Sequence, residues 1–108
     1  ATTLMEVLTS DGDAAVVAAA ARQLSQMTYV DSRELAARFG ELLMRENVGN
    51  RHDSRLATEL VRGALLLYQQ WRVEDPLLVR AILEARNAPY SRETRQMAGR
   101  FVEAVLEG

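Results

Sequence analysis

Apolar residues in this chain recur three and four positions apart and almost never alternate with polar ones, which is the pattern of amphipathic α-helices. Together with start and stop signals, the pattern predicts six helices, at about residues 3–8, 14–27, 31–47, 54–72, 76–86 and from 92 onward. The connections between them are short, and short loops favour antiparallel neighbours. We therefore expect an all-α fold, an antiparallel bundle or array of about five to six short helices.

The expected helix starts share a chemical signature, an Asp or Ser side chain that can accept a hydrogen bond from the first free backbone N–H groups. The phrase DSRELAARFG at 31–40 adds Glu34 for a capping box, and Val30 and Leu35 for a hydrophobic staple. Related phrases return at 53–60 and 90–95, and we interpret them as repeated helix starts, not as a duplicated unit. The hairpin rhythm resembles tetratricopeptide or HEAT-type repeats, but the signature residues of those repeats do not line up. The expected N-caps are Asp13, Asp31, Asp53, Asp75 (followed by Pro76) and Ser91.

Apolar stripes on three of the helices define most of the expected core. The second helix is expected to turn inward Val16, Val17, Ala20, Leu24 and Met27. The fourth is expected to bury Leu56, Leu60, Ala64, Leu67, Tyr68 and Trp71, and the last to bury Met97, Phe101, Val102, Val105 and Leu106.

Length and composition predict a single helical domain over 1–108. The chain begins Ala-Thr-Thr without Met, which leaves open whether it is a whole protein, a processed product or a fragment of a larger one. It has no cysteine and no apolar run near the roughly 20 residues of a membrane span. The alanine-rich stretch at 14–21 also lacks the basic leader of a signal peptide. We therefore expect a cytoplasmic location and no membrane contact.

A helix-turn-helix is the main functional alternative. The segment RELAARFG at 33–40 resembles the opening of bacterial helix-turn-helix regulators, with Ala36 and Gly40 at the spacing that lets two helices pack closely. The resemblance implies a DNA-binding regulator that uses residues 31–62. After Gly40, however, ELLMREN continues the helical stripe, and Glu46 and Gly49 stand where a recognition helix should bury an apolar residue and continue. The net charge of −2 also gives no bulk attraction to nucleic acid, so that partner is disfavoured.

Residues for catalysis or metal binding are sparse. His52, Asp53 and Ser54 are adjacent in RHDSR, but three consecutive residues at a helix start do not converge as a catalytic triad must. With one His and no Cys, the chain lacks the ligands of a zinc site. We therefore expect no enzyme activity, no metal or other cofactor and no small-molecule substrate. A small helical enzyme or ligand carrier is the third hypothesis.

The fourth and fifth helices carry more apolar residues than one inward stripe needs. Either they form the buried centre of the fold, or they expose an apolar patch that binds a partner. The candidate binding residues are Leu66, Val79 and Leu83, which lie off the main stripes, and Trp71, because Trp is favoured at binding hot spots. We expect a non-enzymatic protein–protein interaction module, an adaptor, regulatory subunit or small helical chaperone. Its partner would be another protein or a second copy that makes an oligomer.

Overall fold

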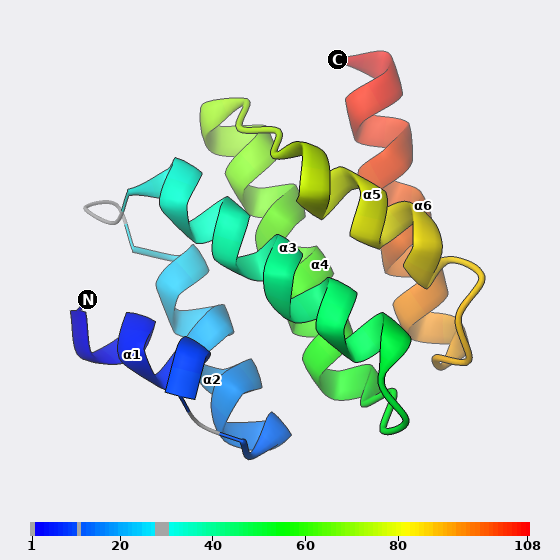
Figure 1. Cartoon of the computed structure of the whole chain (residues 1–108). Helices are drawn as coiled ribbons and strands as arrows, with labels where there is room; N and C mark the ends of the chain where they lie inside the picture. Colours follow the sequence, from blue (N-terminus) through cyan, green and yellow to red (C-terminus); the bar gives the residue numbers. More distant parts are fainter. Residues whose placement is uncertain (1, 11, 28–30) are drawn as a thin grey trace.

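The computed structural model of the chain describes residues 2–10, 12–27 and 31–108, and over that part the fold is all-helical, as the sequence predicts (Figure 1). The helix boundaries agree with the expected ones to within about two residues. Val30, half of the expected hydrophobic staple, lies outside the described residues. The helices are α1 (Thr2–Ser10), α2 (Ala14–Ser25), α3 (Ser32–Val48), α4 (Ser54–Trp71), α5 (Pro76–Ala85) and α6 (Arg92–Glu107).

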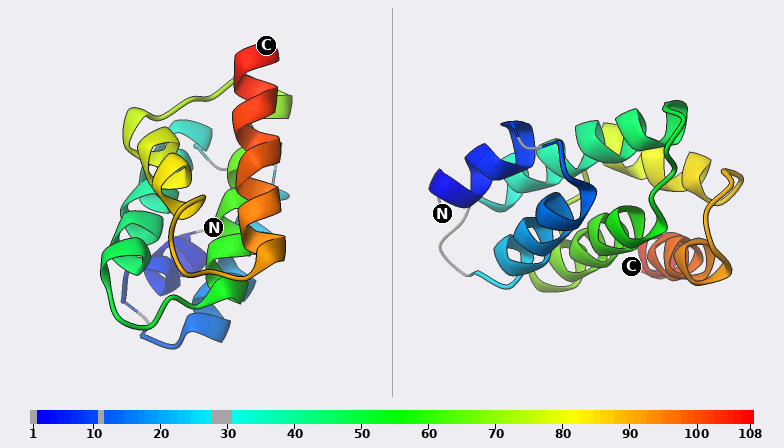
Figure 2. Two further views of the ribbon diagram at one scale, coloured as in Figure 1. Left: turned by 90° about the vertical axis from the view of Figure 1, so that its right-hand side faces the viewer. Right: turned by 90° about the horizontal axis from the view of Figure 1, so that it is seen from below.

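The helices form three successive hairpins stacked in two layers, one of α1, α3 and α5 and the other of α2, α4 and α6 (Figure 2). Helices within a hairpin run antiparallel, as expected, whereas helices within a layer run in the same direction (Figure 1). Each hairpin meets only the next one: among the described residues, no Cα of α1 or α2 lies within 8 Å of α5 or α6. The body measures 33 × 32 × 20 Å, and its shortest dimension matches two helix diameters of about 10 Å.

Every expected N-cap is confirmed. Asp31 Oδ1 accepts hydrogen bonds from the backbone N–H groups of Arg33 at 3.0 Å and Glu34 at 3.2 Å. The side chains of the other four caps accept from a backbone N–H in the first turn of their helix, and Pro76 occupies the start of α5, where no N–H is needed. These short polar residues therefore fix where five of the six helices begin.

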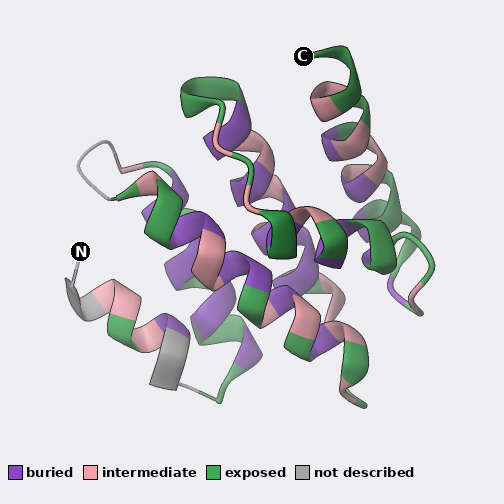
Figure 3. Cartoon of the chain, turned by 45° about the horizontal axis from the view of Figure 1, so that its top comes forward, coloured by how far each residue is buried: buried purple, intermediate pink, exposed green. Residues whose placement is uncertain are grey.

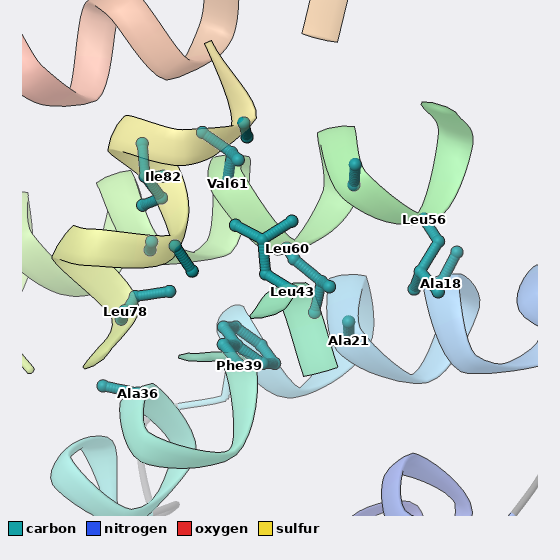
Figure 4. Close-up of a cluster of buried hydrophobic side chains, with 14 of the residues drawn as sticks. Ala18, Ala21, Ala36, Phe39, Leu43, Leu56, Leu60, Val61, Leu78 and Ile82 are labelled. Atoms are coloured by element: carbon teal, nitrogen blue, oxygen red, sulfur yellow. The ribbon is translucent and has the colours of Figure 1, made fainter. Parts of the chain in front are cut away.

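The core lies between the two layers, where the buried faces of the helices meet (Figures 3 and 4). Two glycines allow close packing there. A Cβ on Gly63 would come within 2.5 Å of the Phe39 ring, and a Cβ on Gly40 would lie 2.8 Å from the backbone nitrogen of Leu78. Gly40 therefore lets α3 and α5 approach almost backbone to backbone, which is the close packing that its spacing suggested, but with a different helix.

Three residues expected in the core are exposed instead. Val16 is 42% exposed, because it lies on the side of α2 that faces the short α1 and lines the open groove between these two helices. Trp71 is 50% exposed, because it is the last residue of α4. Leu106 is 80% exposed, because it lies in the last turn of α6 and points away from the buried face that carries Phe101. The expected stripes of α2 and α6 were therefore too wide, because Val16 and Leu106 lie outside the buried faces, and the stripe of α4 was too long, because Trp71 ends the helix.

Candidate functional site

The residues expected to form an apolar patch on α4 and α5 do not share one environment. Leu83 is 43% exposed and Trp71 is half exposed, whereas Leu66 and Val79 are half-buried and Val79 packs against the core. The two helices that carry them belong to different layers. Trp71 borders a groove of about 410 Å³ at the end of α4, together with Arg33 and the charged connection 72–75. The apolar surplus is therefore divided between core contacts and separate exposed side chains.

The segment that resembles a helix-turn-helix has no turn after Gly40. Helix α3 continues through Gly40 to Val48, and the next helix begins only at Ser54. Glu46, the polar residue in a position that should be apolar, is itself buried with 6% of its side chain exposed. The segment 31–62 is thus one long helix, a loop and the first half of α4.

Glu46 joins the end of α3 to the loop before α4. Its carboxylate accepts hydrogen bonds from Arg51 Nη2 at 2.7 Å and Nε at 3.0 Å, and from the backbone N–H of Asp53 at 2.7 Å. Arg51 also donates to the carbonyl of Gly12 at 3.1 Å, which ties the loop to the start of α2. The Arg51 guanidinium, with a smaller contribution from the Asp53 N–H, holds the pKa of Glu46 below its ordinary value against the opposing effect of burial.

A second polar group connects the end of α3 to α5 and to the α5–α6 connection. The Asn47 amide donates to the carbonyl of Ala81 at 2.9 Å and accepts from the Tyr90 hydroxyl at 2.7 Å. His52 Nε2 lies 2.9 Å from the Asn47 carbonyl, and its ring packs edge-on against Tyr90 with centroids 5.5 Å apart. Burial, and to a smaller extent Glu46, raises the pKa of Tyr90, so its hydroxyl stays protonated as a donor. These contacts hold adjacent hairpins in register.

The RHDSR side chains point to separate partners and form no triad. His52 faces Asn47 and Tyr90, Asp53 caps α4 through the Leu56 N–H at 2.9 Å, and the Ser54 hydroxyl accepts from the Ser91 N–H at 2.9 Å. Within residues 2–10, 12–27 and 31–108, no three His, Cys, Asp or Glu side chains gather as metal ligands. None of the helices in the described chain is both long and apolar enough to cross a bilayer.

An apolar groove lies between α1 and α2, on the surface. It has a volume of about 390 Å³, and Gln23 is its only polar lining residue. Leu4 and Val7 form the α1 wall, while Val16 and the alanines at 15, 19 and 20 form the α2 wall. The alanines leave the groove open, because a methyl group fills little of the space between two helices.

A second groove, of about 550 Å³, runs along the opposite side of the same α2 ridge, between α2 and α4. It shares Ala15, Ala19 and Gln23 with the first groove. Two exposed arginines line it, Arg22 from α2 and Arg55 from α4, and neither has an ion-pair partner among the described residues. Glu59 also lines it, but its carboxylate is paired with Arg62. The groove therefore has two uncompensated positive charges.

We name this surface the α2 face: Val16, the ridge of Ala15, Ala19 and Gln23, the α1 wall of Leu4 and Val7, and the arginine pair Arg22 and Arg55. The apolar groove lies on one side of this ridge, and the groove with the two arginines lies on the other. The sequence does not predict this face, because Val16 continues the apolar stripe of α2 and only the arrangement of the layers leaves it uncovered by the described residues. The run of alanines at 14–21 was the available signal, since it predicts a helix that a neighbour can approach closely.

In comparisons with known proteins, no family model, no curated protein and no solved structure matches this chain.

Proposed function

We propose that this protein is a non-enzymatic protein-interaction module, an adaptor, regulatory subunit or small helical chaperone that acts in the cytoplasm and binds its partner on the α2 face. The observation that supports this proposal is the apolar groove between α1 and α2, with Val16 42% exposed in its wall. Exposed apolar area of this kind costs free energy in water and is recovered when a partner covers it.

The occupant we propose is an amphipathic helix with acidic side chains beside its apolar stripe. A helix that lies along the α2 ridge would place apolar side chains in the groove beside Val16, as in other helix-in-groove complexes. Its carboxylates would lie near Arg22 and Arg55, where guanidinium groups can make two parallel hydrogen bonds to each carboxylate. This charge match favours an acidic partner over a neutral one and should make association depend on salt.

The exposed residues on α4 and α5 define a competing face for the same function. Leu83 is 43% exposed, almost the same as Val16 at 42%, and it lies on a helix of the other layer. An aspartate at either position adds the same charge at a site of equal exposure. The pair Val16→Asp and Leu83→Asp therefore distinguishes the two faces with matched effects on stability.

The test is selection of binders from a displayed library of amphipathic helical peptides whose polar positions vary in charge. We expect selected peptides to carry acidic residues beside an apolar stripe. By fluorescence anisotropy, Val16→Asp should weaken their binding about tenfold or more, and Leu83→Asp should leave it unchanged. Raising the salt concentration should weaken binding to the wild-type protein.

Two results would overturn the assignment. If Leu83→Asp abolishes binding and Val16→Asp does not, the binding face is on α5. If no helical peptide is enriched while DNA is retarded in an electrophoretic shift assay at low salt, a DNA-binding function replaces it. Circular dichroism of both variants must show the wild-type helix content for either comparison to count.

A further inference from the structure

Gly99 is a helical glycine that the folded chain does not require. Gly40 and Gly63 lie where a Cβ would meet another helix or ring, but a Cβ on Gly99 would have no atom within 4 Å among the described residues. Gly99 lies in the middle of α6, where glycine destabilises a helix by about 1 kcal/mol relative to alanine. A second helix that packs closely against this side of α6 would explain the absence of a side chain.

The same side of α6 carries apolar and acidic residues toward its end. Val102 and Leu106 follow Gly99 at helical spacing, and Leu106 is 80% exposed. Glu103 and Glu107 stand beside them, both exposed and without an ion-pair partner among the described residues. We name these five residues the α6 edge. In the left-hand view of Figure 2 the last turn of α6 extends beyond α5, while the end of α4 lies beside it, with Tyr68 and Arg72 next to Gly108.

The α6 edge has the chemistry of the occupant proposed for the α2 face, so we infer that a second copy of this chain docks its α6 edge on the α2 face. This inference rests on the proposed function and names its partner. Leu106 would enter the apolar groove beside Val16, and the exposed part of Val102, which otherwise packs against the core, would contact its rim. Glu103 and Glu107 would face Arg22 and Arg55, and Gly99 would let α6 lie close to the alanine ridge.

The layer geometry supports this occupant. The α2, α4 and α6 helices lie side by side in one layer, with α2 and α6 as its two end helices. Docking of α6 on α2 of the next copy would continue that layer. Because the two surfaces differ, the contact is head-to-tail, and it grows into longer assemblies unless the geometry closes a ring.

Substitution of Gly99 separates folding from association. Gly99→Leu places a good helix former in open space, so the melting temperature at low protein concentration should rise by about 4 °C. The same bulk should hold α6 away from the partner's ridge and weaken association about tenfold or more. A melting temperature that falls would show that Gly99 has a structural role within the monomer and would overturn this part of the inference.

Charge reversal identifies the two surfaces. Sedimentation equilibrium from micromolar to millimolar protein should show concentration-dependent association of the wild type. Arg22→Glu/Arg55→Glu and Glu103→Arg/Glu107→Arg should each weaken association about tenfold or more, because like charges then meet. An equimolar mixture of the two double variants should associate again, since each surface then finds the opposite charge. Arg33→Glu/Arg86→Glu, the same charge change elsewhere, should associate like the wild type.

A wild-type protein that stays monomeric at millimolar concentration would overturn the inference. So would association that the α2-face double variant does not weaken, or that the mixture fails to restore. The proposed function is tested separately, because selected peptides can bind the α2 face and respond to Val16→Asp whether or not a second copy does.

Discussion

Gly40→Val is expected to lower the free energy of unfolding by about 3 kcal/mol. The added Cβ would lie 2.8 Å from the backbone nitrogen and 3.0 Å from the Cα of Leu78. Backbone atoms cannot rotate away as a side chain can, so α3 and α5 must move apart. That movement loosens the contacts of Phe39 and Ile82, which are fully buried between the layers. Urea denaturation measures the change.

Gly99→Ala is the control for this prediction, because it adds a side chain to a helical glycine whose Cβ would lie in open space. It should raise the free energy of unfolding by about 0.5–1 kcal/mol, the ordinary difference in helix propensity. If Gly40→Val were tolerated as well as Gly99→Ala, the close contact between α3 and α5 would be wrong.

Glu46→Ala is expected to cost about 2–3 kcal/mol of unfolding free energy. The change removes three hydrogen bonds at once and leaves the Asp53 N–H without its acceptor. The loop between α3 and α4 also loses the anchor of Arg51. The exposed Glu41, which pairs with Arg38 at 3.5 Å, is the control, and its replacement by alanine should cost less than about 0.5 kcal/mol.

The same carboxylate predicts a pH dependence. Because the pKa of Glu46 is lowered in the folded state, the unfolded state binds its proton first as pH falls. The stability from this group is therefore complete above the ordinary pKa of 4.5 and is lost as pH falls through the lower folded value. Acid denaturation of Glu46→Ala should begin at a higher pH but proceed less steeply over that window. An unchanged slope would show that Glu46 is not held ionised by Arg51.

Local chemistry made the helix starts predictable. An Asp or Ser before an apolar run contacts backbone N–H groups only two or three residues away, so the sequence alone contains both partners. The stacking of hairpins was not predictable in the same way. It depends on contacts such as Gly40 with Leu78 and Asn47 with Tyr90, whose partners are far apart in the sequence and follow no periodic pattern.

The candidate site was missed for a related reason. Periodicity assigns Val16 and Leu106 to the apolar stripes of their helices, but their exposure depends on which sides of each helix its neighbours cover. Val16 borders a short α1, and Leu106 lies in the last turn of α6. Conversely, Val79 lies off the main apolar stripe of α5 and was expected to bind a partner. It packs against the core instead, because α3 and α6 cover α5 on two sides.

The restriction of contacts to adjacent hairpins has a consequence for how stability is distributed. With no contact between the first hairpin and the third, the free energy of folding is close to a sum of three hairpin contributions and two interface contributions, as in a linear chain of coupled units. The middle hairpin takes part in both interfaces, whereas each outer hairpin takes part in one. Partial unfolding should therefore start at the ends of the array, and the destabilisation from a substitution should fade with distance along it.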